Sequence, residues 1–275
     1  METRYFCIRG YMKSGTNWLC RILRHHPEVD CVGEFHWETF YQALKANANR
    51  INPKRKQQYQ TVVQANLESL VQRSLSQFAE PDALWIGDRT PTTLQPVILT
   101  DAPHFVIVRD FRDVIVSRMF HLYNHPRVTS VFDHYPEMKR RLEKYQDDQW
   151  YFRQHPEELL ANEEIIRTSA KEWSQFLASD EATMLDNPQL RVLRIKYEQL
   201  HSEFNSTVGS IFEFLGLDAP TSFPERLTPG IEVEAPGELN RKGAVGDWKT
   251  YMNDTCLGWI EEEAGEQLQN QGYCC

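Results

Sequence analysis

The stretch RYFCIRGYMKSGTNWLCRILRHH, residues 4–26, decides the fold of this 275-residue chain. Residues 4–9 form a short aromatic and β-branched run, which predicts a strand, and residues 16–25 place apolar side chains at helical spacing. Residues 10–15 are therefore a turn from a strand into a helix. Such a turn directs backbone N–H groups at one spot, where the helix dipole also favours an anion. This part of the chain predicts a cradle for a phosphate or sulfate group.

The side chains of this turn also suit an anion. Lys13 adds a mobile positive charge, and Gly15 lets the backbone approach a ligand closely. Further donors come from Ser14, Thr16 and Asn17. The turn is not a Walker A loop, because in GxxxxGK[ST] the lysine follows the second glycine, whereas Lys13 precedes Gly15 by two residues. At this point an anion-binding turn and an ordinary strand-to-helix turn are both open.

A second polar stretch follows an apolar run. Residues 105–108 read FVIV, which is typical of a strand buried on both faces in a parallel sheet, and a helical pattern follows. Arg109 therefore lies at the carboxyl end of a strand, the edge where open α/β sheets bind ligands, and Ser117 lies about two turns into the helix. A salt bridge from Arg109 to Asp110 or Asp113 is the structural alternative.

Two further stretches lie in the last third of the chain. Residues 190–195 read LRVLRI and predict another strand, which Tyr197 follows within two residues. Arg241 and Lys242 stand beside Gly243, after a segment rich in proline and glycine, and we expect them on a loop that folds over a bound nucleotide. Two cations beside a glycine suit a phosphate group.

Together and in this order, the stretches resemble the cofactor signature of the sulfotransferases that use 3′-phosphoadenylyl sulfate (PAPS). They are YMKSGTNW at 11–18, VRDFRDVIVS at 108–117, KYE at 196–198 and RKGAVGDWK at 241–249. The resemblance implies a P-loop NTPase-like α/β fold with a central parallel sheet flanked by helices. It also implies PAPS as co-substrate, 3′,5′-adenosine diphosphate (PAP) as product, and no metal.

The resemblance also implies a set of residues for the nucleotide. Arg109 and Ser117 would grip the 3′-phosphate, while Trp18 and Tyr197 would contact the adenine. Each of the two aromatic residues has a role in the apolar core as its alternative. The implied cofactor-binding residues are Lys13, Ser14, Gly15, Thr16, Asn17, Trp18, Arg109, Ser117, Tyr197, Arg241, Lys242 and Gly243.

The family offers two models for the general base. In the cytosolic small-molecule enzymes it is the histidine of a K-T-H segment, but the corresponding GDRTP at 87–91 has Pro91 at that position, and proline cannot accept a proton. HPEVDCVGE at 26–34 instead resembles the tyrosylprotein sulfotransferases and makes Glu34 the expected base. His36 is the alternative base.

Two cations complete the expected catalytic set. Lys13 would meet the bridging oxygen of the leaving phosphate, and Arg89 would point at the sulfuryl group or at the base. Positioning and positive charge carry most of the catalysis in the related phosphoryl transfers.

The composition limits the classes of partner and the cellular location that we expect for the protein. A formal net charge of −9 argues against a nucleic-acid or anionic-membrane surface. The chain has no apolar stretch near 18 residues and no signal-like start, so we expect a cytoplasmic protein without a membrane span. The six cysteines show no metal-ligand spacing and favour reduced thiols. Cys274 and Cys275 form either a loose tail or a lipidation site.

We expect one sulfotransferase domain over residues 1–275, with inserted helical segments at about 36–80 and 119–180 that roof the acceptor site. The predicted reaction is in-line transfer of a sulfuryl group from PAPS to a hydroxyl or amine of a small-molecule, glycan or lipid acceptor. A nucleotide-binding protein of the same fold without catalysis and a P-loop kinase are the alternatives. The sequence names neither the acceptor nor the oligomeric state.

Overall fold

The computed structural model describes residues 3–48, 53–94, 99, 101–126, 130–229 and 243–273. The chain forms two compact units. The first unit comprises Met1–Tyr11, Gly15–Val108 and Ser179–Leu227, and the second comprises Met12–Ser14, Arg109–Ala178 and Thr228–Cys275.

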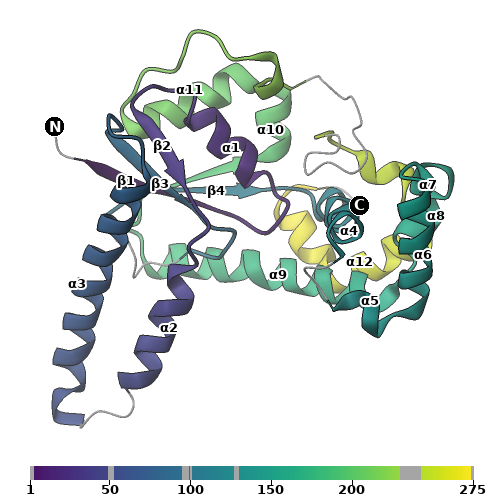
Figure 1. Ribbon diagram of the computed structural model, residues 1–275, viewed down its shortest axis with the longest axis horizontal. Coiled ribbons are helices and arrows are strands. Elements are labelled where there is room, and N and C mark those ends of the chain that lie inside the picture. The colour runs from purple at the N-terminus through teal and green to yellow at the C-terminus, as the bar shows by residue number, and fades with distance from the viewer. Residues whose placement is uncertain are drawn as a thin grey trace. The chain divides into compact units, whose positions relative to one another are not determined.

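The first unit is built on a five-stranded, all-parallel sheet within the described part of the chain (Figure 1). Its strands are β1 (Arg4–Arg9), β2 (Val29–Val32), β3 (Trp85–Arg89), β4 (His104–Val108) and β5 (Val192–Lys196), in the order β2-β3-β1-β4-β5. The predicted α/β class with a central parallel sheet is confirmed, as are the three strands expected at 4–9, 105–108 and 190–195, within two residues at each end.

Both faces of this sheet are covered. Phe6 and Ile8 of β1 enter one apolar cluster, together with residues of α1 (Thr16–Leu23) and α11 (Phe204–Leu215). Cys7, between them, enters a second cluster with α3 (Pro53–Phe78). Because side chains of a strand alternate between the two faces, β1 needs helices on both sides to bury its apolar residues.

The remaining elements of the first unit are helical. They are α2 (Trp37–Ala48), α10 (Tyr197–Ser202) and the short helix η2 (Glu225–Leu227). Figure 1 shows α2 and α3 side by side and projecting beyond the strands. The helices α2 and α3 occupy the first segment that we expected to be an insertion, at about 36–80.

The second unit is helical. Its elements are α4 (Phe111–Asn124), α5 (Val131–His134), α6 (Pro136–Asp147), α7 (Tyr151–Gln154), α8 (Pro156–Leu159), the larger part of α9 (Glu163–Asp186), η3 (Asp247–Thr250) and α12 (Asp254–Asn270). Helices also fill most of the second segment that we expected to be an insertion, at about 119–180, where Pro136 begins α6 and Pro156 begins α8.

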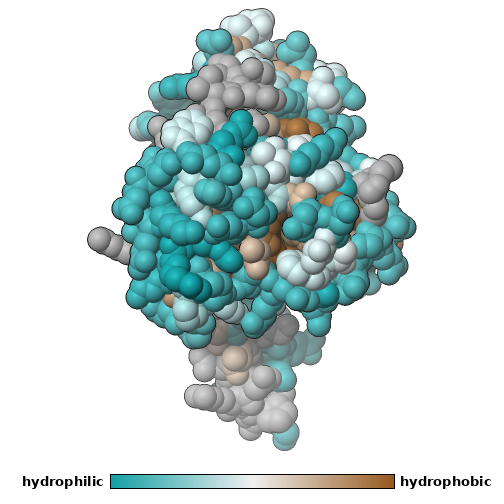
Figure 2. All heavy atoms as spheres, turned by 90° about the vertical axis from the view of Figure 1, so that its right-hand side faces the viewer, coloured by the Kyte–Doolittle hydropathy of each residue, from teal (hydrophilic) through white to brown (hydrophobic). Residues whose placement is uncertain are grey.

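Helix caps define two of these helices. The side chain of Asp110 accepts from the backbone N–H of Arg112 at 2.9 Å and begins α4, and Asn253 accepts from that of Cys256 at 2.9 Å and begins α12. The face drawn in Figure 2 is mainly hydrophilic with scattered apolar residues, as the charged composition predicts. In the described ranges, no helix is both long enough and apolar enough to cross a membrane.

One buried carboxyl in the first unit is only half satisfied. Asp180 of α9 is 2% exposed, and one of its oxygens accepts from the backbone N–H of Leu94 at 2.7 Å. Its Oδ2 has no hydrogen-bond partner among the described residues. Burial raises the pKa of Asp180 to about 7, although the Leu94 bond and the charges of Arg194 and Arg9 act in the opposite direction.

We expect the stability of the wild type to fall with rising pH relative to that of Asp180→Asn. A carboxyl with a raised folded-state pKa favours folding below its unfolded pKa and loses that contribution as the pH rises through the folded value. The variant should therefore gain roughly 2 kcal/mol on the wild type between pH 5 and pH 8. Urea unfolding at both pH values measures this. Asp186→Asn, exposed on the same helix, is the control, and a pH-independent difference for Asp180→Asn would contradict the expectation.

Candidate functional site

The expected turn after β1 is present and begins a helix. Gly15 is the N-cap of α1 with φ 103°, and its carbonyl accepts from the N–H groups of Trp18 and Leu19 at 3.0 and 3.1 Å. Lys13 has φ 66°, in the left-handed region that residues with a side chain rarely adopt. The turn therefore has the geometry of an anion-binding strand-to-helix connection.

Ser14 supplies a test of whether this turn fits a ligand. Its side chain is 1% exposed, and its Oγ has no hydrogen-bond partner among the described residues. A buried hydroxyl without a partner is unfavourable, so a polar ligand or water is expected to satisfy it. A phosphate oxygen suits this hydroxyl, and the structure thus agrees with the anion expected here.

Three residues of the predicted cofactor set gather in the first unit: Gly15, Trp18 and Tyr197. A Cβ at Gly15 would lie 2.6 Å from Cδ2 of Tyr197, so a glycine is required for the ring to approach. The rings of Trp18 and Tyr197 meet edge to face at 5.3 Å between centroids. Trp18 is half-buried and donates from Nε1 to the carbonyl of Leu227 at 2.8 Å. Their contact with adenine stays a prediction.

The expected base and its partners also meet in the first unit. Glu34 follows β2, and Arg89 ends β3, the neighbouring parallel strand. The guanidinium of Arg89 pairs with the Glu34 carboxylate at 2.5 Å, and Nε2 of His36 lies 4.0 Å from the other carboxylate oxygen. The Glu34 side chain is 40% exposed, so the acid is held in place and still open to a reactant.

In the second unit, Arg109 connects two backbone segments. Its guanidinium donates to the carbonyl of Lys13 at 3.2 Å and to that of Ala244 at 2.9 Å. Ser117 lies on α4, in the helix where the sequence predicted it, and is half-buried. Neighbouring carboxylates have partners of their own: Asp110 pairs with Arg112 at 2.7 Å, and Asp113 accepts backbone hydrogen bonds. Gly243 has φ 67°, while Arg241 and Lys242 lie outside the described residues.

His121 of α4 was not singled out in the sequence, and Asp113 was considered only as a salt-bridge partner of Arg109. Asp113 follows Arg109 by four residues, and His121 follows Ser117 by four, so helical spacing was the available signal. Burial, together with the positive charge of Lys13 and the neighbouring His125, lowers the pKa of His121 to about 4. His121 is therefore neutral near pH 7, and its pKa would rise if a bound anion neutralised the charge of Lys13.

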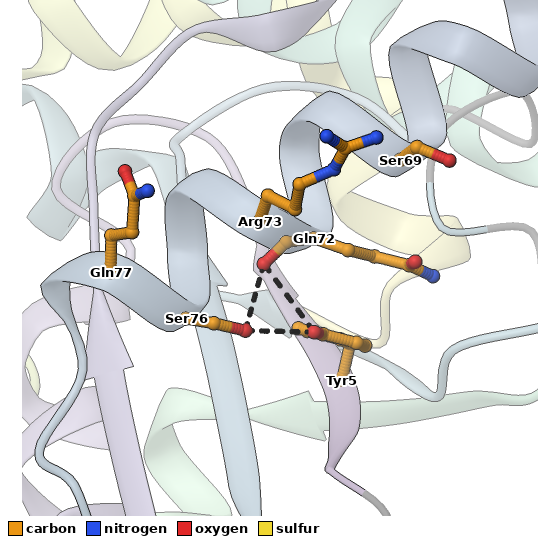
Figure 3. Close-up of a pocket in the computed structure, with 6 residues that line it drawn as sticks. All are labelled: Tyr5, Ser69, Gln72, Arg73, Ser76 and Gln77. Carbon is orange, nitrogen blue, oxygen red and sulfur yellow. Dashed lines mark hydrogen bonds between the residues drawn. The ribbon is translucent and has the colours of Figure 1, made fainter.

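Other hollows and clusters involve different residues. An open hollow of about 390 Å³ lies beside α3 and is lined by Tyr5, Ser69, Gln72, Arg73, Ser76 and Gln77 (Figure 3). Tyr5 lies within 2.9 Å of Ser76 there, and no predicted site residue within the described ranges lines this hollow. His155, Glu157 and Glu158 have a spacing that a metal could use, but Glu158 already lies 3.6 Å from Arg141 and 3.7 Å from Lys144.

Sequence relatives support the likeness read from the motifs. The family model described as the sulfotransferase domain matches residues 4–272 and so covers most of both units. The chain is 30% identical to cytosolic sulfotransferase 4 of Arabidopsis thaliana over 109 residues, which cover 36% of this chain and 38% of the relative. Cytosolic sulfotransferase 5 of the same plant is 29% identical over 110 residues, or 32% of this chain and 34% of the relative. These matches span little more than a third of the relatives' length.

Solved structures share the fold. Mouse sulfotransferase SULT7A1, complexed with PAP, superposes with a TM-score of 0.52 at 18% identity, covering 97% of this chain and 85% of that one. Retinol dehydratase in complex with androsterone and the inactive cofactor PAP superposes with a TM-score of 0.50 at 16% identity, covering 98% and 82%. At these identities the likeness concerns the fold.

We expect Gly15→Ala to destabilise the protein by about 1–3 kcal/mol. The new methyl group would meet the Tyr197 ring and would also force alanine to adopt a positive φ. Urea unfolding measures the change. Gly209→Ala in α11 is the matched control, because a Cβ there meets nothing within 4 Å, and it should stabilise the helix by about 0.5–1 kcal/mol. Equal effects of the two substitutions would refute the proposed close approach.

Proposed function

The chain belongs to the sulfotransferase domain family, and from this premise we propose that it transfers a sulfuryl group from PAPS to a hydroxyl or amine of an acceptor. One observation carries the proposal furthest: the turn before α1 buries a serine hydroxyl that has no partner among the described residues, beside the left-handed Lys13 and the N-cap glycine. Such a turn suits an oxyanion of a nucleotide. Bound PAPS would supply the sulfuryl group itself.

The proposed nucleotide-binding residues are those that the motifs assign. Ser14, Gly15, Thr16 and Asn17 would bind the 5′-phosphate through backbone and side-chain donors. The other members of the set are Lys13, Trp18, Arg109, Ser117, Tyr197, Arg241, Lys242 and Gly243. Arg109 donates charge-assisted hydrogen bonds to two carbonyls, and these hold its guanidinium in one orientation, which suits recognition of a phosphate.

We propose Glu34 as the general base. Its carboxylate would accept the proton of the acceptor hydroxyl as the acceptor oxygen forms its bond to sulfur and the bond from sulfur to the phosphate oxygen breaks. Arg89 orients this carboxylate through the ion pair seen in the structure, and Lys13 would stabilise the negative charge that develops on the leaving oxygen. His36, close to the same carboxylate, is the alternative base.

The acceptor and the location of the protein also belong to this proposal. Glu34 is accessible and the turn suits an anion, but the chemistry fits small molecules, glycans and lipids alike. The curated relatives are named as cytosolic sulfotransferases, and we propose a cytoplasmic location for this chain as well. A P-loop kinase is the less favoured alternative, because Lys13 lies before Gly15, where a Walker A loop has its lysine after the glycine.

Calorimetric titration tests the cofactor. We expect PAP to bind far more tightly than ATP with Mg²⁺, because the 3′-phosphate provides charge that ATP lacks at that position. Ser14→Ala should weaken PAP binding by about tenfold, since it removes one donor to a charged group. Tighter binding of ATP than of PAP would overturn the proposal in favour of a kinase.

Substitution of the base tests catalysis. With PAPS and probe acceptors such as 4-nitrophenol and simple alcohols, Glu34→Gln should lower turnover by about 10²–10⁴ and change the affinity for PAP by less than about threefold. Glu28→Gln, a carboxylate beside β2 outside the proposed machinery, is the control. A silent nucleotide-binding protein would show no turnover in any form, and loss in His36→Gln alone would move the base to His36.

A further inference from the structure

We propose that Cys20 of α1 and Cys31 of β2 are a redox-sensitive pair, and that their oxidation to an intramolecular disulfide weakens nucleotide binding at the turn before α1. The two cysteines lie on segments that flank the proposed site. The helix α1 begins at that turn, and Glu34 follows Cys31 by three residues. The effect on nucleotide binding rests on the proposed function, whereas formation of the disulfide does not.

The two cysteines contact each other in the folded chain. Sγ of Cys20 donates to the carbonyl of Cys31 at 3.8 Å, and the two thiols also form a hydrogen bond with each other. Both belong to the same apolar cluster, in which Cys20 is 8% exposed and Cys31 is 4% exposed. A disulfide needs Cβ atoms roughly 3.5–4.5 Å apart. Side chains that already share a hydrogen bond can reach that geometry by a small rotation and a small movement of the backbone.

Cys20 is the thiol that is suited to react first. The hydrogen bond from Cys31 lowers the pKa of Cys20, and the positive charges of Arg89 and Arg24 act in the same direction. Burial and the charge of Asp30 oppose this effect. The thiolate is the form of cysteine that oxidants attack, and Cys20 also has the larger exposed fraction of the two. Burial and the bond to Cys20 raise the pKa of Cys31, so its thiol reacts second.

The oxidation requires a peroxide or another oxidant that accepts two electrons. The Cys20 thiolate attacks one oxygen of hydrogen peroxide, the O–O bond breaks, and the products are a sulfenic acid and a hydroxide that takes up a proton to become water. The Cys31 sulfur then attacks the sulfenic sulfur, and the hydroxyl leaves with the Cys31 proton as a second water. Both sulfur atoms are oxidised and both peroxide oxygens are reduced.

Two other buried cysteines lack these features. Burial raises the pKa of Cys7 to about 11 and that of Cys256 to about 12. Both are free thiols, and neither forms a hydrogen bond with another cysteine within the described ranges. Because their thiols stay protonated near neutral pH, we expect them to resist an oxidant that reacts with the pair.

Closure of the disulfide would move the start of α1. A covalent bond between the two sulfur atoms is shorter than a hydrogen-bond contact, so α1 and β2 must shift toward each other. Gly15 is the N-cap of α1, and the residues around it carry the N–H groups that we propose for the phosphate. A misplacement of about 1 Å can lower the rate of a reaction between positioned groups by about 100-fold.

The proposed base lies close to the same pair. The charge of Arg89 acts on both thiols, and its guanidinium also pairs with Glu34. A Cβ at Gly33 would lie 2.5 Å from the carbonyl oxygen of Arg89, so the ends of β2 and β3 pack without spare room. A movement of β2 is therefore transmitted to Arg89, the partner of the base.

Mass spectrometry of the full chain tests the pairing. After treatment with hydrogen peroxide and alkylation of free thiols in denaturant, trypsin should release residues 14–21 joined to residues 25–45, since each of these peptides contains one cysteine of the pair. The peptide of residues 5–9 should carry an alkylated Cys7. Dithiothreitol added before alkylation should abolish the link. Absence of the joined peptides, or a link that includes Cys7 in place of either partner, would overturn the inference.

Calorimetric titration with PAP tests the effect on binding. Oxidation of the wild type should weaken PAP binding by about tenfold, and dithiothreitol should restore it, which excludes methionine sulfoxide as the cause. Reduced Cys20→Ala should bind PAP within about threefold of the wild type and should not respond to the oxidant. Cys256→Ala, which removes a buried thiol elsewhere, is the control and should respond as the wild type does. If Cys20→Ala does not fold, Cys20→Ser serves the same purpose.

Linkage provides a measurement that a purely structural role of the cysteines would not affect. If the disulfide weakens PAP binding tenfold, PAP must favour the dithiol over the disulfide by the same factor. In glutathione redox buffers, saturating PAP should therefore lower the fraction of joined peptides, which corresponds to a shift of the midpoint potential by about 30 mV. An unchanged midpoint would contradict the coupling.

The outcomes separate this inference from the proposed function. A disulfide that forms without changing PAP affinity would overturn the coupling while the proposed function stands. A reduced wild-type protein that does not bind PAP would overturn the proposed function, and the effect on nucleotide binding with it. The joined peptides would still decide whether the pair itself exists.

Discussion

The parallel pairing of β1 between β3 and β4 is the constraint on which the first unit depends. Alternation sends Phe6 and Ile8 into one apolar cluster and Cys7 into the other, so the strand is stable only with helices on both faces. Parallel strands also end at a common edge of the sheet. Glu34 and Arg89, which follow or end neighbouring strands, meet there although 55 residues separate them. The meeting of these two proposed catalytic residues is therefore a consequence of strand order.

Four of the buried charged side chains each have more than one partner. Arg9 and Asp88 pair at 2.7 Å with both side chains almost fully buried, and Thr90 donates to Asp88 as well. In the second unit, Asp113 and Arg109 each make two bonds to backbone groups. Because a buried charge is unfavourable without partners, such groups are held in one orientation. A guanidinium held in this way, such as that of Arg109, favours recognition of an anion, since little entropy is lost on binding.

Local sequence patterns predicted the helices and strands better than they predicted the contacts between side chains. The run at 105–108 is a buried strand, and the turn before residue 16 begins a helix, because both signals lie within a few residues. Family resemblance, more than spacing, placed Glu34 beside Arg89. From the sequence, Asp113 was named only as a salt-bridge partner of Arg109, because its hydrogen bonds to backbone N–H groups cannot be recognised from residue types.

The sequence by itself predicted three of the five strands described here, the turn proposed to bind an anion and the family that the chain resembles, because hydrophobic period, glycine position and motif order are properties of neighbouring residues. Only the tertiary structure decided that Arg109 reaches the carbonyls of Lys13 and Ala244, and that Asp113 holds the turn at Gly246. These bonds join segments from 96 to 135 residues apart. Every residue except proline carries the same backbone donor and acceptor, so the path of the folded chain, and not residue identity, selects which of them meet.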